Sequence, residues 1–596
     1  DEHIYFQLRE TPITGSVNSL LGTRLNPLSF TNPYIEFKTF EGTLVVDADY
    51  KFNGGTGKTQ LYLMPGAKIL VEDGYKLHLQ NVDIFTCDKL AAGIEVEGGA
   101  LLNADNTACN DCRFAIDAKP EAILELKNNS FTDNYIGLNL DMSQGSSGSR
   151  RVQFNTMEGN VFKSDLGLKT PYAGMPEAVE YRGYCGIRLS QYQDFNIGKN
   201  QTFLSLANGI VGYNSTGNIN SMAFTDMHST GAPSVYPFEG YGIYLESKGS
   251  HWFNINNDWA TMQFDDCVTG IYARNYAGIV EEVDMENVEN GIVWERTKNR
   301  DIVVKNNKIS ATKYGIKLHH NEPLHPSSLL ENNNITITGL GAGNNPVTGI
   351  LMTEGNFGTS FGAGWKVKNN TVDMTKGGNG IAYLDGLGGS IEGNMVNDLG
   401  QGSTPGKYKG ITVEGSVLSQ VNYNDVTRST SAGGNASSVA LYSQAGTSNE
   451  FICNCVDNTG LGMQFNDMAD YEENVKGNQF NNHGETGLQI GDDNMDNAYI
   501  GIQTRTGNNW DLGAIPSNGY GGVHKAGNNA DIVGLSQFYV DPNDTDGHPE
   551  VDPSEWFLDA SGGTYVCPSQ NTCEAPTTPP PTRWACRSNF TTRWTR

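Results

Sequence analysis

One short phrase recurs along most of the chain: a glycine, an aliphatic residue, any residue, and then an apolar residue. Its copies begin at Gly93, Gly137, Gly186, Gly242, Gly270, Gly291, Gly315, Gly349, Gly380, Gly410, Gly460 and Gly487. The glycines at 270, 291 and 315 are 21 and 24 residues apart, and other intervals are longer. Regular self-similarity at a period of about 20–50 residues indicates a repeat architecture, so this phrase constrains the fold more than any single motif.

A second phrase precedes most copies: an alternating stretch that ends at asparagine, followed by a phenylalanine, valine or isoleucine. Examples are Asn128-Asn129-Ser130-Phe131, Asn306-Asn307-Lys308-Ile309 and Asn369-Asn370-Thr371-Val372. Glycine and asparagine tolerate positive φ and favour turns, and the chain holds 71 glycines. Each unit therefore contains two or three short strands with a period of two, separated by Gly/Asn turns.

Units of this size built only of short strands predict an all-β fold, a single parallel β-helix. Each unit is one rung, inward aliphatic side chains stack on those of the next rung, and asparagines at a repeated turn form a side-chain ladder. An α-solenoid requires long amphipathic helices, and the sequence lacks their periodicity. A β-propeller requires about 40 residues per blade, which exceeds the shortest period here.

The two phrases resemble those of right-handed parallel β-helix proteins of the pectate-lyase-like superfamily, over about residues 60–510. The resemblance implies a right-handed coil. It does not imply one activity, because that superfamily includes lyases, hydrolases, epimerases, phage tailspikes, adhesins and surface proteins.

The end of the repeat region resembles the ending of large secreted β-helix proteins of Bacteroidetes-type bacteria. The residues that carry this resemblance are Phe538-Tyr539-Val540, Pro549-Glu550-Val551-Asp552-Pro553, Trp556-Phe557 and Cys567. Such proteins often carry a C-terminal signal for type IX secretion, and none is evident here. The resemblance implies an extracellular or cell-surface location, and Asp1 suits a mature N-terminus left by signal-peptide cleavage.

Four segments are expected. Residues 1–60 lack the repeat and form an N-terminal cap, because an open β-helix end exposes unpaired backbone groups. Residues 61–510 form the coil, and residues 511–573 form a C-terminal cap. Residues 574–596 begin as a Pro/Thr-rich linker of polyproline character, whose threonines are candidates for O-glycosylation, and end as an irregular tail.

The charge balance excludes some partners. Asp and Glu number 67 against 40 Lys and Arg, giving a net charge of −27. A protein that binds phosphate backbones or anionic lipid needs the opposite sign, so nucleic acid is not expected. No run of about 18 apolar residues occurs, so no membrane insertion is expected.

Catalytic groups are expected on outward strand positions, where side chains of adjacent rungs lie about 4.8 Å apart. The third position of the glycine phrase has no acid cluster in the middle of the chain. The preceding strand is richer, and aligned copies place Thr225, Asp265, Glu286 and Lys305 in one column, with Asp284 beside it. Two acids with a lysine suit a hydrolase or a lyase. The alternative is a solvated acidic face.

Aromatic residues suggest a glycan-binding surface, because exposed rings stack on sugar faces. The candidates are Trp252, Trp259, Tyr244 and Tyr272. The alternative is that the loop at 228–261 packs its aromatic side chains on the coil.

A cluster of acidic residues near the C-terminus resembles a calcium-binding loop. Its members are Asp541, Asn543, Asp544 and Asp546. The match is imperfect, because Pro542 occupies the first ligand position of the pattern. We therefore expect no required cofactor, with Ca²⁺ as the one candidate ion.

There are ten cysteines. Cys567 and Cys573 flank a short turn and are predicted to form a disulfide. Cys109 and Cys112 are also close in sequence.

Three functions from different classes are compatible with these features. The first is a non-catalytic, secreted structural β-helix that serves as a surface spacer, adhesin or filament subunit. Its partners would be other copies of itself, stacked head to tail, or cell-surface polymers. The second is an extracellular polysaccharide lyase or glycoside hydrolase. The third is a glycan-binding module.

Overall fold

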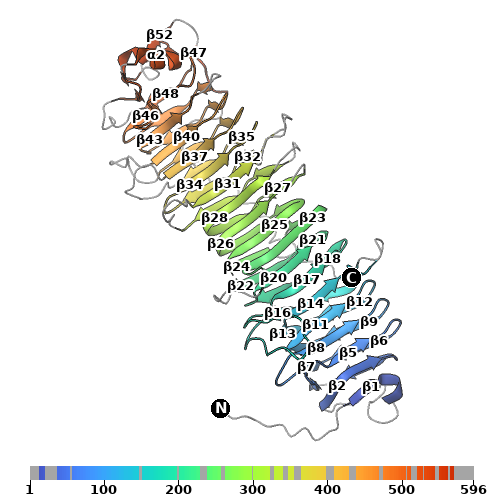
Figure 1. Cartoon of the computed structure of the whole chain (residues 1–596). Coiled ribbons are helices and arrows are strands. Elements are labelled where there is room, and N and C mark those ends of the chain that lie inside the picture. The colour runs from blue at the N-terminus through green and yellow to red at the C-terminus, as the bar shows by residue number, and fades with distance from the viewer. Residues whose placement is uncertain are drawn as a thin grey trace, which may run out of the picture.

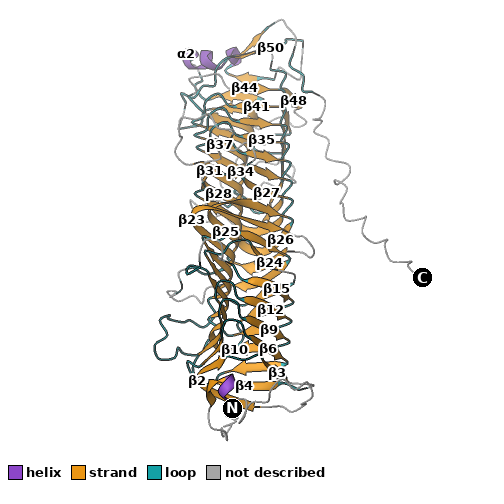
Figure 2. Cartoon of the chain, turned by 90° about the vertical axis from the view of Figure 1, so that its right-hand side faces the viewer, coloured by secondary structure: helices purple, strands orange, loops and turns teal. Residues whose placement is uncertain are grey.

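The computed structural model describes residues 13–20, 37–53, 57–145, 151–197, 200–228, 236, 238–256, 262–297, 300–321, 328–339, 347–354, 364–397, 408–428, 438–468, 474–494, 496–504, 506–511, 520–527, 529–543, 549–560 and 564–568. Over these residues the chain is a long stack of short strands. The stack has the shape of a rod, with β1 and β2 at one end and β52 at the other (Figures 1 and 2). The prediction of an all-β parallel β-helix is confirmed.

The strands form three ladders that run along the rod, here called A, B and C, and every strand pair among the described residues is parallel. Ladder A holds the strands of the glycine phrase. After β1 (Ile13–Ser16) it comprises β2 (Phe37–Val46), β5 (Lys68–Val71), β8 (Ala91–Val96), β11 (Cys112–Ala118), β14 (Ile136–Asp141), β17 (Cys185–Ser190), β20 (Asn208–Tyr213), β23 (Tyr241–Asn256), β25 (Thr269–Glu281), β26 (Val283–Glu295), β28 (Lys308–Asn321), β31 (Thr348–Glu354), β34 (Asn379–Leu384), β37 (Tyr408–Glu414), β40 (Ser438–Gln444), β43 (Leu461–Asn466), β46 (Thr486–Ile490), β49 (Gly522–His524) and β51 (Val551–Asp552).

Ladder B precedes ladder A in each rung and shares β2, β26 and β28 with it. Its other strands are β4 (Thr59–Leu63), β7 (Val82–Phe85), β10 (Ala108–Asn110), β13 (Ser130–Thr132), β16 (Val161–Lys163), β19 (Gln201–Leu204), β22 (Met222–Met227), β24 (Met262–Cys267), β30 (Asn334–Ile337), β33 (Thr371–Met374), β36 (Met395–Asn397), β39 (Asp425–Thr427), β42 (Cys455–Asp457), β45 (Gln479–Asn481) and β48 (Asn509–Asp511).

Ladder C is in two parts. The first comprises β3 (Tyr50–Asn53), β6 (Lys76–Gln80), β9 (Leu101–Asp105), β12 (Ile123–Lys127) and β15 (Gln153–Glu158). The second shares β23 and β25 with ladder A and adds β18 (Phe195–Ile197), β21 (Gly217–Asn220), β27 (Ile302–Lys305), β29 (Leu329–Glu331), β32 (Lys366–Lys368), β35 (Ser390–Glu392), β38 (Gln420–Asn422), β41 (Glu450–Ile452) and β44 (Asn474–Lys476).

A small sheet lies near the C-terminal end of the rod, formed by β47 (Gln503–Thr504), β50 (Phe538–Val540) and β52 (Phe557–Asp559). Helical structure among the described residues is limited to α1 (Val17–Leu20), α2 (Ala530–Val533), η1 (Gly534–Ser536) and η2 (Ser554–Trp556). None of these is long and apolar enough to cross a bilayer.

In the described part of the chain, ladder A already begins at β1 and still continues at β51, so the coil extends beyond the expected range 61–510 at both ends. Aliphatic side chains at the second position of the glycine phrase stack in the interior, as expected. Ile116 and Ile210, which lie outside the named copies, join the same column by register. The column includes Ile94, Ile116, Leu138, Ile187, Ile210, Ile243, Ile271, Ile292 and Ile316, all of which are buried.

A phenylalanine stack from ladder B fills the same interior. Phe203, Phe224 and Phe264 follow one another with ring centroids 4.7 and 4.8 Å apart and planes within 7° of parallel. This stack explains why the phrase contains a glycine here. A Cβ at Gly242 would lie 2.5 Å from Cδ1 of Phe264 and 2.7 Å from the carbonyl oxygen of Gly270. At Gly291 and Gly315 the neighbours are instead Ile309 and Ile335, so these phrases begin with glycine because a side chain of ladder B, aromatic or aliphatic, occupies the space of a Cβ.

The predicted asparagine ladder is present at the turn that follows ladder C. Its longest run is Asn307, Asn333, Asn370, Asn394, Asn424, Asn454, Asn478 and Asn508. Each Nδ2 donates to the Oδ1 of the next member at 2.8–3.0 Å. Each of these side chains is buried, and Oδ1 also accepts the backbone N–H of the preceding member. The ladder satisfies backbone groups at a turn that water does not reach.

The predicted bond between Cys567 and Cys573 is wrong. Cys567 is bonded to Cys453, which lies 114 residues earlier in the chain. Cys455 is disulfide-bonded as well. Sequence proximity suggested the wrong partner because coiling brings residues of distant rungs and the C-terminal segment side by side.

Candidate functional site on the outer face of ladder A

The predicted acidic column lies on ladder B and is reproduced in part. Thr225, Asp265 and Glu286 are register partners on β22, β24 and β26. Lys305 does not belong to this column, and its expected position is wrong. It lies on β27 of ladder C, in register with Glu281, and forms an ion pair with that residue at 2.9 Å. Asn306 has a left-handed backbone conformation, with φ 57°, at the turn from ladder C into ladder B. The lysine next to the acids is therefore Lys308.

The carboxylates of this column already have partners. Lys308 Nζ lies 3.4 Å from Asp284 Oδ1 and 3.2 Å from Glu286 Oε1. Asp265 Oδ1 accepts a hydrogen bond from Asn287 Nδ2 at 3.0 Å. The Glu286 side chain is 59% exposed, so these are solvent-screened interactions worth less than about 1 kcal/mol each. Hydrogen bonding to Glu286, together with the charge of Asp284, raises the pKa of Lys308.

Two of the predicted glycan-binding residues lie together on the outer face of ladder A. Tyr244 and Tyr272 are register partners, and their rings stack with centroids 5.0 Å apart and planes 4° from parallel. Phe238 stacks on the other side of Tyr244 at 4.1 Å, and Tyr244 is only 2% exposed. Tyr272 is half-buried. Of the pair, Tyr272 is therefore the one whose ring meets solvent.

The two tryptophans do not join this pair. Trp252 is 39% exposed and lies on β23, beyond the corner that leads into ladder C, where it is in register with Ala277. Trp259 lies outside the described residues.

A row of charged side chains runs beside the stacked tyrosines. Glu246, Arg274, Glu295 and His319 occupy one outward column on β23, β25, β26 and β28. Tyr244 Oη donates to Glu246 Oε2 at 3.0 Å, and Tyr272 Oη donates to Glu295 Oε2 at 2.9 Å. Arg274 Nη1 lies 3.2 Å from Glu246 Oε1. The row thus presents a carboxylate, a guanidinium, a carboxylate and an imidazole on successive rungs.

The local electrostatics keep both tyrosines protonated. Burial raises the pKa of Tyr244 and of Tyr272, and the adjacent glutamates raise each further. The hydroxyls therefore remain donors to the carboxylates over the whole physiological pH range, which fixes the orientation of Glu246 and Glu295.

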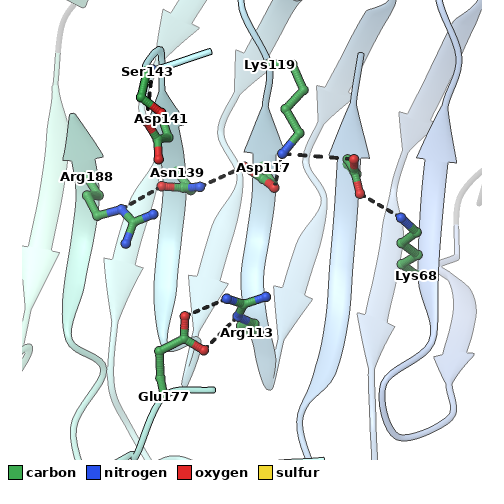
Figure 3. Close-up of polar contacts among 10 residues, drawn as sticks. Lys68, Arg113, Asp117, Lys119, Asn139, Asp141, Ser143, Glu177 and Arg188 are labelled. Carbon is green, nitrogen blue, oxygen red and sulfur yellow. Dashed lines mark hydrogen bonds and ion pairs between the residues drawn. The ribbon is translucent and has the colours of Figure 1, made fainter. Parts of the chain in front are cut away.

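A second polar row continues the same face toward the N-terminal end (Figure 3). Lys68 and Lys119 flank Glu95 at 2.8 and 3.9 Å. Lys119 also contacts Asp117 at 2.7 Å. From there Asn139 Nδ2 donates to Asp117 Oδ1 at 2.7 Å, and Arg188 Nε donates to Asn139 Oδ1 at 2.8 Å. We call the two rows together the outer strip of ladder A.

Residues 164–184 form a wall beside the N-terminal part of this strip, where Lys169 contacts Thr86 O and Asp111. Asp133 anchors the start of the segment by accepting the backbone N–H groups of residues 165–167 at 2.8–3.2 Å. Farther along, Glu177 forms a two-point ion pair with Arg113 of β11 at 2.5 and 2.8 Å (Figure 3). Tyr184, the last residue of the segment, forms an aromatic cluster outside the coil with Tyr135 and Tyr236.

The third position of the glycine phrase does not reveal the charged row. The row lies two positions later, after Gly242, Gly270, Gly291 and Gly315, and the same alignment contains it. Asp117 was missed for another reason. Its rung, with Phe114 in register with Ile136, has no glycine to mark it.

Two groups of side chains in the described part of the chain are candidate metal ligands. Asp226, His228 and Asp266 place ligand atoms within 4.8 Å of one another. Asp226 already accepts hydrogen bonds from Arg182 and Ser205, and His228 Nε2 lies 3.0 Å from Asp266.

In the predicted calcium loop, Asn543 N and Nδ2 both donate to Asp541 Oδ1, at 2.9 and 3.0 Å. That oxygen therefore caps a turn. Asp544 and Asp546 lie outside the described residues, so Ca²⁺ binding there stays a prediction.

No protein-family model, no curated protein and no solved structure matches the chain. The fold and the outer strip therefore define it only as a parallel β-helix with a charged and aromatic face.

Proposed function

We propose that this chain is an extracellular structural β-helix that acts as a rigid rod at the cell surface, in the role of a spacer or adhesin. The observation that carries the proposal is the continuity of ladder A. Its strands follow one another from β2 to β51 with each strand bonded to the next. At about 4.8 Å per rung, the 19 strands from β2 to β51 in the described part of the chain span about 85 Å.

Rigidity follows from how each rung is held. Parallel hydrogen bonds join it to both neighbours, the buried aliphatic and phenylalanine columns fill its interior, and the asparagine ladder ties the turns. The disulfide from Cys453 to Cys567 fastens the C-terminal segment to the side of the coil. A rod of this kind keeps whatever it carries at a fixed distance from its attachment point.

An extracellular location is supported by chemistry and by resemblance. Disulfides persist in oxidising compartments, and the chain has them. The net charge of −27 favours solubility and resists nonspecific adsorption to anionic surfaces. The resemblance of the repeat phrases to the pectate-lyase-like superfamily, and of the C-terminal phrases to Bacteroidetes-type surface proteins, points the same way.

Electron microscopy of the purified chain tests this role. We expect straight single rods of about 85 Å, and end-to-end filaments at high concentration would identify a filament subunit. Protease treatment of intact source cells, followed by detection of the chain, tests the location. Globular or bent particles, or full protection from protease on intact cells, would contradict the proposal.

Glycan binding along the outer strip is the second candidate function. It is favoured by the alternating row Glu246, Arg274 and Glu295 beside the stacked tyrosine pair, because polar groups repeated at one rung spacing suit a polymer lying along the rod. A glycan array probed with the native chain and with Glu295→Gln tests it, and Asp284→Asn on ladder B is the matched control. Loss of binding in both variants, or in neither, would remove the strip from consideration.

The same array tests catalysis. Release of sugar products that stops in the double variant Asp265→Asn and Glu286→Gln would assign a lyase or hydrolase to ladder B instead.

A further inference from the structure

A pair of cysteines occupies the corner between ladders B and A, away from the outer strip. Cys109 lies in β10 and Cys112 begins β11, with a tight turn between them in which Asp111 has φ 61°. Both side chains point into the coil and are 1% and 0% exposed. The spacing is that of a C-x-x-C motif, in which two thiols separated by two residues are held close.

The two sulfur atoms are in contact. Cys109 Sγ lies 3.6 Å from Cys112 Sγ, and both cysteines are free thiols. A disulfide requires about 2.0 Å between the sulfurs, with the two side chains facing each other. The side chains already face each other, so a small adjustment within the turn closes the remaining gap.

The next rung holds the backbone of this corner in place. Asn134 Nδ2 donates to the carbonyl oxygen of Cys109, and Asn134 Oδ1 accepts the N–H of Cys112, both at 2.8 Å. The Asn134 side chain therefore hydrogen-bonds to the backbone of both cysteines. These hydrogen bonds do not involve the sulfur atoms, so they form whether or not the disulfide is present. The corner is organised for a bond before the bond forms.

We propose that Cys109 and Cys112 form a redox pair that closes to a disulfide in an oxidising environment. In the closing step two S–H bonds break and one S–S bond forms, and two protons and two electrons leave. A disulfide oxidant such as oxidised glutathione accepts them and becomes two thiols, through a mixed disulfide. The product is a covalent staple across a corner that Asn134 otherwise holds by hydrogen bonds alone.

Burial controls when this step takes place. The hydrogen bond to Cys109, followed by burial, raises the pKa of Cys112, so the reactive thiolate is scarce in the folded rod. The oxidant also has no access to sulfurs that are 0–1% exposed. The pair therefore closes faster during folding than after it, and a folded dithiol persists for long periods until the rung opens.

Mass spectrometry of the full chain tests the proposal. The protein is refolded with reduced and oxidised glutathione, acid-quenched, denatured and alkylated without reductant, and the peptide holding residues 109–112 is analysed. We expect this peptide to carry no alkyl group and to have lost the mass of two hydrogen atoms. Cys185 and Cys267 are buried single thiols on other rungs and serve as internal controls that remain alkylated.

The variant Cys112→Ser provides the second arm. It removes the partner, so Cys109 should be found alkylated or joined to glutathione, never in an internal bond, while circular dichroism verifies that the coil has formed. Full alkylation of both cysteines in native protein under strongly oxidising glutathione would overturn the proposal. So would equal closure rates in the folded and the unfolded chain. Neither outcome bears on the proposed role as a rod, because the test does not use location or partners.

Discussion

Tyr244 and Tyr272 stack face to face on consecutive rungs, and each donates its hydroxyl to a glutamate of the adjacent column, Glu246 and Glu295 respectively. The pair therefore has two functions at once. The rings cover the sheet, and the hydroxyls orient two carboxylates on the outer strip. The two tyrosines differ in exposure, since Phe238 covers Tyr244 and leaves Tyr272 half-buried.

This difference predicts different effects of truncation. Tyr244→Ala should lower the free energy of unfolding by about 3–5 kcal/mol, because it empties a buried aromatic site. Tyr272→Ala should lower it by about half as much. Tyr272→Phe keeps the stack and removes only the bond to Glu295, at a cost of about 1 kcal/mol. Urea titrations followed by circular dichroism measure all three. Equal losses for the two alanine variants would show that Phe238 does not cover Tyr244 in solution.

The glycine of the repeat phrase should be intolerant of even one methyl group. In Gly242→Ala the added Cβ would lie 2.5 Å from the ring of Phe264, with a backbone oxygen 2.7 Å away. Overpacking of this kind costs about 3 kcal/mol. Gly534→Ala is the matched control, because no heavy atom lies within 4 Å of its new Cβ and it should change stability little. Thermal melts compare the melting temperatures of the two variants. An unchanged melting temperature for Gly242→Ala would mean that the ring of Phe264 can move aside.

The asparagine ladder should be sensitive at its centre. Asn394 Nδ2 donates to Val367 O and to Asn424 Oδ1, and its Oδ1 accepts two hydrogen bonds from Asn370. Asn394→Ala leaves two buried backbone groups of the preceding rung, Val367 O and Asn370 N–H, without this partner, and it removes one of the two donors to Asn424 Oδ1. The loss should cost about 3 kcal/mol or more.

Hydrogen exchange should show the loss spreading to the rungs of Asn370 and Asn424. The exposed Asn494 gives a control, since Asn494→Ala should leave exchange in the coil unchanged. Protection that is lost only at the mutated rung would argue against cooperation along the ladder.

The sequence predicted the parts of this molecule that repeat. The recurrence of Gly242, Gly270 and Gly291 specifies rungs, because one physical requirement, space for a side chain of ladder B, recurs in each. The parts that do not repeat were not predictable in this way. The pairing of Cys453 with Cys567 and the wall contact from Arg113 to Glu177 join segments whose separation no local pattern encodes. Lys305 was assigned to the wrong ladder because the corner between ladders C and B lies between Lys305 and Lys308, and no sequence pattern marks where one strand ends and the next begins.

Asp425 should make stability depend on pH. It lies on β39, and burial, with a further contribution from the charge of Asp457, raises its pKa from 3.8 to about 6. In the unfolded chain the pKa returns to the ordinary value, so between these two values the folded protein binds a proton that the unfolded chain does not. The free energy of unfolding therefore increases as the pH falls from above 6 to below 3.8. Two pKa units correspond to about 3 kcal/mol.

The variant Asp425→Asn has no such proton to bind. Other titrating groups, including the buried His483, affect wild type and variant alike and cancel in the comparison. The stability of wild type minus that of Asp425→Asn should thus rise by about 3 kcal/mol between pH 7.5 and pH 3.5. Asp457→Asn is the second comparison, because removing that charge should lower the pKa of Asp425 and reduce the pH effect in part. Denaturation midpoints of the three proteins at the two pH values measure these differences. If the free energy of unfolding of wild type and of Asp425→Asn changed with pH in parallel, the Asp425 carboxyl would have its ordinary pKa in the folded protein.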